Sequence, residues 1–443
     1  MGRQRQLLWL FLMVAFLFPL PGCEIFNRVV ISPDGKILYF AVNKEAGFVP
    51  DETSEVYAFY IEEKRMVRLT EDQFPDVWPS LSPDGKSLLF VKAEPFFSED
   101  DKAPRIYFAK TPDSRPLNFS GGAYQFDGVP EWTDSGTFFW QRMTFAIHSG
   151  AESHGQELSS QWAYAGVSRD TALIRELHRM PYYGDKIPET ATEVECFSTT
   201  LPVWRVNKVY FSTAKARVSE GKPSETVDIS IQVNEGDPPV TRTIASFSAT
   251  IAQQSAEDIG KPLYAWNDLA VSPDEKKIVC ALLNPDLESD AFPSRVYLID
   301  VETGEAKLLF DDTNAYYPQW SPDGASFLFL SGAKELEGET EVEGRRLMVW
   351  EVEGSTKRQL LFYPGKYLEC YTGWTWLSEE RLRAFHLAEG GLWITDINPH
   401  GTEKSETRYT RAELLDMKSK ADTEGPPWAE KENHLPEPES AGK

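Results

Sequence analysis

A five-residue motif, Ser-Pro-Asp-Gly-Lys, recurs along the chain and limits its fold more than any other feature of the sequence. The motif is complete at 32–36 and 82–86, has Glu in place of Gly at 272–276, and returns as Ser-Pro-Asp-Gly at 321–324. Pro presets φ in such a segment, Asp can bond to the nearby backbone, and Gly accepts the left-handed conformation that closes a tight turn. An apolar run follows each copy, for example ILYFAV at 37–42, so each copy predicts a turn between two antiparallel strands.

Weaker copies of the motif extend the repeat to seven units. Each unit is anchored by one apolar or aromatic residue, and consecutive anchors lie 49 to 72 residues apart. Further strand-like runs, rich in β-branched and aromatic residues, follow each anchor, and one four-stranded propeller blade has this length. The sequence therefore predicts an all-β fold, a β-propeller of four-stranded blades, with seven blades and with six or eight as alternatives. The anchors, whose Trp members we expect to pack between blades, are Ile31, Leu81, Trp132, Trp204, Val271, Trp320 and Trp376.

The motif, followed by an aromatic strand, resembles the repeat of TolB-type propellers, which are relatives of WD-repeat propellers. The resemblance covers about residues 24–411 and implies the propeller fold. It does not imply one function, because propellers with such repeats act as scaffolds, ligand binders and caps of enzymes.

The first 22 residues are typical of a secretory signal peptide. Arg3 and Arg5 make a cationic start, and the apolar run at 7–20 is shorter than the 20 or so residues that a membrane-crossing helix needs. We therefore divide the chain into a signal peptide at 1–22, a propeller at 23–411 and a remainder at 412–443. The remainder is rich in Glu, Lys and Pro with little apolar periodicity, which predicts a disordered acidic tail.

The end of the signal peptide resembles the lipobox of bacterial lipoproteins. Leu20, Gly22 and Cys23 match that pattern and Pro21 departs from it. The resemblance implies that Cys23 receives a diacylglycerol and holds the protein on a membrane as a periplasmic or surface lipoprotein. The residue after the Cys is Glu24 and not Asp, so the resemblance implies export onward to the outer membrane. An ordinary secretory signal followed by an unrelated Cys is the alternative.

The charge balance excludes one class of partner. Asp and Glu number 69 against 45 Lys and Arg, which gives a formal net charge of −24. Nucleic-acid binding needs clustered positive charge, so we expect no nucleic-acid partner. We expect a monomer. Cys280 lies in the apolar run KKIVCALL, which predicts a buried, inert thiol.

A search for catalytic and metal-binding patterns finds none that we assign. The sequence has no Gly-x-Ser-x-Gly, no phosphate loop and no Cys-x-x-Cys, and its six His are scattered. The Asp residues of the repeated motif are expected to be turn residues rather than calcium ligands. We therefore predict no catalytic residue, metal or cofactor. The alternative is a metal-dependent polysaccharide lyase or hydrolase, because some seven-bladed propellers with similar repeats are oligogalacturonate lyases that bind a cation through clustered His.

The segments between the second and third strands of several units are long and acidic. They run over 43–54, 92–104, 284–294 and 331–344, whereas the turns after the anchors are short. Binding residues concentrate on loops that a rigid scaffold holds, so these segments predict an acidic face for an envelope protein or glycan. The alternative is that they serve solubility alone. The predicted partner-binding residues are Phe48, Phe96, Phe97, Phe292, Glu335, Glu337 and Glu339.

Overall fold

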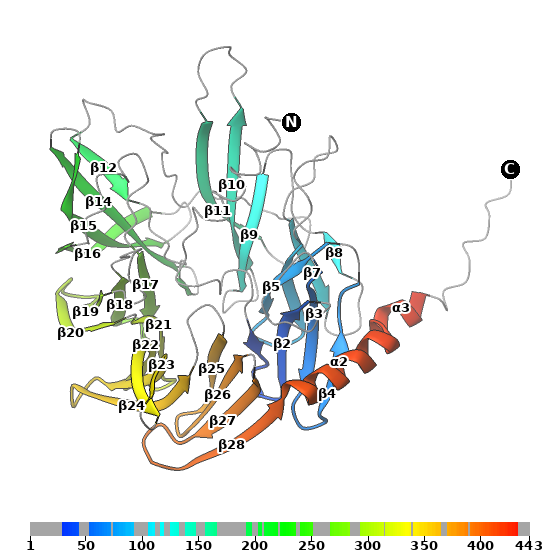
Figure 1. Cartoon of the computed structure of the whole chain (residues 1–443). Helices are drawn as coiled ribbons and strands as arrows, with labels where there is room; N and C mark the ends of the chain where they lie inside the picture. The colour runs from blue at the N-terminus through cyan, green and yellow to red at the C-terminus, as the bar shows by residue number, and fades with distance from the viewer. Residues whose placement is uncertain are drawn as a thin grey trace, which may run out of the picture.

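Seven antiparallel sheets, each made of strands that are consecutive in the sequence, follow one another around a ring in the computed structural model (Figure 1). The structure describes residues 29–43, 53–71, 74–92, 105–110, 116–118, 125–132, 138–147, 156–165, 192–196, 203–205, 208–219, 222–235, 240–250, 266–283, 293–313, 315–337, 340–364, 370–388 and 390–432. Within these ranges no helix has the length and apolar character needed to cross a membrane.

The first three sheets contain eleven described strands. The first sheet consists of β1 (Val30–Ile31), β2 (Ile37–Val42), β3 (Glu55–Tyr60) and β4 (Arg65–Arg68). The second consists of β5 (Asp76–Leu81), β6 (Ser87–Lys92), β7 (Arg105–Lys110) and β8 (Leu117–Asn118). The third consists of β9 (Gln125–Trp132), β10 (Phe138–Ile147) and β11 (Gln156–Ala165).

In the fourth sheet, two short strands pair with different parts of the same neighbour, β14. This sheet consists of β12 (Glu193–Cys196), β13 (Val203–Arg205), β14 (Lys208–Ser219), β15 (Lys222–Glu235) and β16 (Val240–Thr250). The fifth consists of β17 (Trp266–Val271), β18 (Lys277–Leu283), β19 (Pro293–Asp300) and β20 (Ala306–Thr313). The sixth consists of β21 (Tyr316–Trp320), β22 (Ser326–Glu337), β23 (Thr340–Glu351) and β24 (Thr356–Pro364). The seventh consists of β25 (Cys370–Ser378), β26 (Arg381–Ala388), β27 (Gly391–Ile397) and β28 (Lys404–Thr410).

The predicted all-β propeller of four-stranded blades is confirmed. First strands of successive sheets contact one another, as β1 and β5 or β17 and β21 do, so they form the inner wall of the ring. The number of blades stays a prediction, because residues 166–191, after the third described strand of the third sheet, lie outside the described ranges.

The repeated motif forms the turn that the sequence predicts. In the first copy the Ser32 hydroxyl donates to Asp34 Oδ1 at 2.6 Å and accepts the Ile37 amide at 2.9 Å. The Gly35 amide donates to the Ser32 carbonyl at 2.8 Å, with φ of 72° at Gly35. The other three copies repeat the Ser-to-Asp bond, which confirms that these Asp are turn residues.

Two anchor tryptophans join neighbouring sheets through the same bond. Trp132 Nε1 donates to the carbonyl of Ser80, and Trp320 Nε1 to that of Ala270, each at 3.0 Å. Ser80 and Ala270 each precede the anchor of the preceding sheet, so the bond recurs at equivalent positions. The expected packing of Trp anchors between blades is confirmed for these two residues.

The first and seventh sheets meet side by side and close the ring. Tyr409 on β28 donates its hydroxyl to the carbonyl of Ile61 at 3.0 Å, and its ring contacts Phe59 at 5.0 Å between centroids. The guanidinium of Arg383 on β26 donates to the carbonyl of Gly35 in the first turn. Neither sheet, in its described strands, contains a strand from the other end of the chain, so side chains and backbone carbonyls make this contact.

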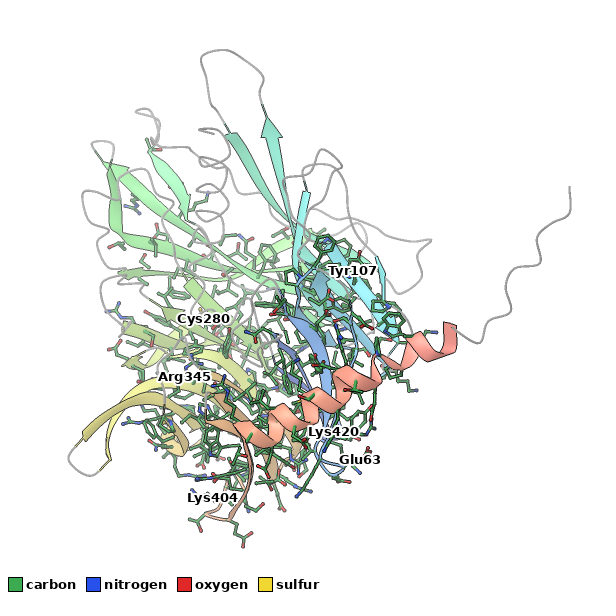
Figure 2. All side chains as sticks on the ribbon, turned by 45° about the vertical axis from the view of Figure 1, so that its right-hand side comes forward. Glu63, Tyr107, Cys280, Arg345, Lys404 and Lys420 are labelled. Atoms are coloured by element: carbon green, nitrogen blue, oxygen red, sulfur yellow. The ribbon has the colours of Figure 1, made fainter. Side chains whose placement is uncertain are left out.

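The prediction of disorder after residue 411 is wrong for the part that the structure describes. The chain forms α2 (Arg411–Glu424) and α3 (Pro427–Glu432), and α2 lies against β4, β27 and β28 (Figures 1 and 2). Thr410 and Glu413 form a capping box that starts the helix. Residues 433–443 lie outside the described ranges.

The helix is held by a narrow apolar stripe and a few polar contacts. Leu414, Met417 and Ala421 are buried in the core shared by the first and seventh sheets. The Tyr57 hydroxyl donates to Asp422 Oδ1 at 2.5 Å, and Trp428 Nε1 donates to the Leu69 carbonyl at 2.9 Å. Three apolar positions among many charged residues give little periodicity, which is why the composition predicted disorder. The C-terminal helix is therefore a clasp across the ring closure.

The clasp predicts different stability effects for two adjacent leucines. Leu414 is 2% exposed and Leu415 is 36% exposed. Leu414→Ala should lower the free energy of unfolding by about 2–5 kcal/mol, as large-to-small changes in cores do. Leu415→Ala should change it by less than about 0.5 kcal/mol, as surface changes do. Urea unfolding of both variants measures this, and equal small effects would mean that the helix does not pack on the ring in solution.

Candidate binding face

The two ends of the ring differ in the length of their connections. Connections between first and second strands, and between third and fourth strands, lie at one end, which we call the turn end; none between described strands exceeds six residues. The opposite end, which we call the connection end, carries the connections between second and third strands. Three of these connections are long and comprise residues 43–54, 93–104 and 284–292. One end is thus closed by tight turns, and the other carries the longer segments.

The predicted partner-binding residues fall mostly on these segments. Phe48, Phe96, Phe97, Phe292 and Glu339 lie outside the described residues, so their predicted role stays a prediction. They belong by sequence to the connection end.

The remaining two predicted residues lie on a strand instead of a loop. Glu335 pairs with Val342 and Glu337 with Thr340 in the β22–β23 hairpin, which leaves only 338–339 between the strands. The interpretation of 331–344 as a long loop is therefore wrong. Its glutamates alternate with other residues, a pattern compatible with a strand, and the density of charge obscured it.

A buried polar cluster lies at the connection end between the first two sheets. Glu55 and Asp76 are the first residues of β3 and β5, and Lys92 is the last of β6. Arg68 Nη2 and Thr70 Oγ1 bind the two oxygens of Glu55 at 3.0 and 2.6 Å. Lys92 Nζ lies 3.8 Å from Asp76 Oδ1, whose residue is 0% exposed. The cluster holds together the strand ends from which the segments with Phe48, Phe96 and Phe97 depart.

The charge of this cluster depends on Asp76. Burial, above all, and the nearby charge of Glu55 raise the pKa of the Asp76 carboxyl well above its usual range, and Arg68 opposes this. Because Asp76 and Glu55 are both buried, the cluster can bind or release a proton but cannot touch a substrate directly.

A second buried group lies at the same end between the sixth and seventh sheets. Arg345 on β23 is 1% exposed, and its Nη1 lies 3.5 Å from Thr372 Oγ1 on β25. The ring of His386 stacks on that of Tyr363 at 4.8 Å between centroids. Burial, and then the charge of Arg345, lower the pKa of His386 to about 3, so this His is neutral at physiological pH. Lys92 of the first cluster lies over the ring of Tyr107. Figure 2 labels Tyr107 and Arg345, which mark the two clusters on separate sheets.

The sequence did not reveal either cluster, because the members of each come from several strands of two neighbouring sheets. The one available signal was a charged or imidazole side chain in an otherwise apolar strand, as at Lys92 and His386. Such a residue predicts a buried polar partner but does not identify it.

The described residues offer no group of three or more His, Cys, Asp or Glu side chains that could hold a metal ion. His148, His154, His178 and His434 lie outside those residues, so the lyase alternative is not tested. Cys280 is buried, as predicted, and burial raises the pKa of its thiol.

The raised pKa of Asp76 predicts a pH dependence of stability. The folded state keeps a proton that the unfolded state releases, so the stabilisation by this group is complete below the unfolded pKa of about 3.9 and is lost as pH rises to the folded value. Over that window the free energy of unfolding should fall by at most about 1.4 kcal/mol per pH unit relative to Asp76→Asn.

Denaturant unfolding of both proteins between acid and neutral pH measures that difference. Asp311→Asn, which changes an exposed carboxylate, is the matched control. Parallel curves for the wild-type protein and Asp76→Asn would contradict the assignment.

Comparison with known proteins shows similarity in fold and does not identify a family. No family model matches the sequence, and a search of curated proteins finds no relative. Among solved structures, the chain is similar to a prolyl endopeptidase (TM-score 0.50, 10% identity, 89% of this chain and 53% of that one). It is also similar to an oligogalacturonate lyase in complex with manganese (0.46, 12%, 86% and 87%) and to TolB from Acinetobacter baumannii (0.34, 15%, 76% and 65%). The chain spans about half the length of the endopeptidase and just under two thirds of TolB.

Proposed function

We propose that this protein is a lipid-anchored β-propeller of the bacterial cell envelope that binds a protein or glycan partner and catalyses no reaction. The observation that supports the proposal most is the difference between the two ends of the ring. Tight hydrogen-bonded turns close one end, and the connection end carries the longer segments above buried polar clusters. Rigid scaffolds commonly bind through loops arranged in this way.

The chemistry of the connection end indicates the kind of partner. Residues 92–104, KAEPFFSEDDKAP, combine two adjacent Phe with four acidic residues, three of them consecutive at 99–101, and the whole chain carries a net charge of −24. Aromatic side chains supply most of the energy of many interfaces, and charges around them set specificity and association rate. A partner with a cationic surface around an apolar patch fits this segment.

The envelope location rests on the segment Leu20-Pro21-Gly22-Cys23 and predicts a change in fractionation. Cys23→Ser removes the thiol that would be acylated, so the variant should move from the membrane fraction to the soluble envelope fraction. Several acyl chains are needed for stable attachment, because one chain binds only marginally. Fractionation and mass measurement test this. A variant that stays on the membrane with unchanged mass would exclude lipidation at Cys23.

The binding face predicts that two aromatic residues carry affinity. A partner is first captured by chemical crosslinking in detergent-solubilised envelope. Changing Phe96 and Phe97 together to Ser should then weaken its binding at least tenfold, while the thermal midpoint of unfolding stays nearly constant. Affinity should also fall as salt rises, since exposed charges are screened over about 8–10 Å at physiological ionic strength.

A matched control for this double substitution is Leu308→Ser, which changes an apolar residue that is 44% exposed on β20. It should leave binding unchanged. A loss of stability in the Phe96 and Phe97 variant would show that these side chains belong to the core, and unchanged affinity would remove them from the interface.

A further inference from the structure

We infer that one proton on Asp76 controls how firmly the clasp helix and α3 are held on the ring. The two helices are docked while the proton is bound and loosen when it leaves. This control requires neither the lipid anchor nor the binding face proposed above. It is carried by the short segment 68–71, which contacts the buried cluster on one side and the two helices on the other.

On its cluster side, the segment is fixed to the carboxylate of Glu55. Arg68 Nη2 and Thr70 Oγ1 donate to the two oxygens of that carboxylate at 3.0 and 2.6 Å. Arg68 Nε also donates to the Thr70 carbonyl at 2.8 Å, and the Val56 amide donates to Thr70 Oγ1 at 3.0 Å. Because the guanidinium holds both the carboxylate and the backbone, a movement of the guanidinium displaces the segment.

On its other side, the same segment is held by the C-terminal helices, which lie beside β4 (Figure 1). Trp428 Nε1 of α3 donates to the carbonyl of Leu69 at 2.9 Å. Gly425, the C-cap of the clasp helix, lies next to Glu71, whose carboxylate is 3.4 Å from Arg68 Nη1. The helices therefore rest on the backbone that the cluster positions.

Tyr57 connects the cluster and the clasp helix a second time. It lies two residues after Glu55 on β3 and directly opposite Arg68 on β4, so the three side chains share one face of the first sheet. The hydroxyl of Tyr57 donates to Asp422 Oδ1 of the clasp helix at 2.5 Å. The face that carries Glu55 is thus the face that the clasp helix covers.

Asp76 lies beside Glu55 and holds the proton of the cluster. Its amide donates to the carbonyl of Ser54 at 2.8 Å, which brings the first residues of β3 and β5 together. Both oxygens of its carboxyl are buried, and burial together with the charge of Glu55 raises the pKa of this carboxyl well above its usual range. The neutral carboxyl can donate to the carboxylate of Glu55. The ionised form instead adds a second buried negative charge.

Loss of the proton changes the position that Arg68 favours. Lys92 Nζ lies 3.8 Å from Asp76 Oδ1, beyond hydrogen-bond distance, so it offsets the new charge only in part. Arg68 is the other cation of the cluster, and the ionised Asp76 attracts its guanidinium. Since that guanidinium also holds the Thr70 carbonyl, the backbone between them moves and the bond from Trp428 weakens.

The direction of the pH dependence follows from the charged and titratable groups around Asp76. Among the described residues these are Glu55, Tyr57, Arg68, Glu71, Lys92, Tyr107, Lys418 and Asp422. Burial raises the pKa of Glu55 as well, so the two buried carboxyls release one proton as the pH rises. Because linkage is reciprocal, docked helices hold this proton, and its release raises the equilibrium constant for their opening by at most about tenfold per pH unit.

Amide hydrogen exchange of the full chain tests this control. The exchange rate of residues 411–424 in the wild-type protein is divided by that in Asp76→Asn at the same pH, which cancels the intrinsic pH dependence of exchange. Asn keeps the size of the side chain and stays neutral at every pH. The ratio should rise at least about threefold between about pH 5 and pH 9. A constant ratio would overturn the inference, whatever its value, so a uniform effect of the substitution on stability does not count.

Two controls separate opening of the helices from unfolding of the ring. At about pH 9 residues 411–424 of the wild-type protein should exchange at least about tenfold faster than residues 293–300, which form β19 in the fifth sheet. Equal rates would mean that the helices leave only when the whole ring unfolds, which also overturns the inference. Asp311→Asn, which changes an exposed carboxylate, should follow the wild-type protein at every pH.

The route through the segment 68–71 is tested by Trp428→Phe. This substitution keeps an aromatic ring and removes the donor to the Leu69 carbonyl. Measured in the Trp428→Phe background, with and without Asp76→Asn, the rise of the ratio with pH should shrink to less than about half. A rise of full size would show that the proton acts on the helices without this bond and would overturn the proposed route.

Discussion

The hydroxyl of a single serine fixes the turn between the first and second strands in four of the seven sheets. It donates to the Asp two residues later and accepts the amide five residues later, so one side chain sets where the second strand begins. The alternation of buried and exposed side chains along the second strand depends on where that strand begins. A slip of one residue would exchange the buried and exposed faces. At Glu275 the usual Gly is replaced and φ is 58°, a conformation that costs a non-Gly residue about 1–2 kcal/mol. The Glu275 carboxylate accepts bonds from Lys208 at 2.6 Å and Tyr210 at 2.8 Å on the preceding sheet, so the contact between sheets offsets local strain.

The features that could be predicted from the sequence are those that short stretches of chain determine. The turns, the strands that follow them and the buried thiol of Cys280 all depend on residues within a few positions of one another. The bond from Trp132 to the preceding sheet spans 52 residues but recurs with the repeat, so it too could be anticipated as packing between blades. The clasp helix could not, because Leu414, Met417 and Ala421 are buried only where the seventh sheet meets the first sheet, which lies hundreds of residues earlier in the chain. The cluster of Glu55, Asp76 and Lys92 escaped prediction because its members come from three strands of two sheets. The pairing of Glu335 and Glu337 within a hairpin is local, and there the density of charge obscured the strand pattern.

Closure of the ring is the step that no repeat specifies. The first and seventh sheets have no partner in sequence on one side, and each keeps its own four strands. The other neighbouring sheets are joined by the chain itself, whereas the first and seventh are held together by contacts of Tyr409, Arg383 and the clasp helix. Part of that supply is polar: Lys418 is 5% exposed, lies over the ring of Tyr57 and pairs with Asp422 at 2.7 Å. Polar contacts of this kind add geometric selectivity, since a displaced helix would take Lys418 away from the Tyr57 ring and leave the Tyr57 hydroxyl without Asp422.

The uneven placement of buried charge suggests why the two ends of the ring differ. Replacing a buried ion pair by apolar residues is often neutral or stabilising, so stability alone does not explain Arg68, Glu55, Asp76 and Lys92. All four stand where strands end at the connection side, next to the connections at 43–54 and 93–104. Among the described residues, the turn end carries the partly buried pair of Arg383 and Asp396 but no fully buried carboxylate like Asp76, and its turns are held by bonds of backbone and hydroxyl. Features that add little to stability and recur at one place are expected where a protein works rather than where it merely folds.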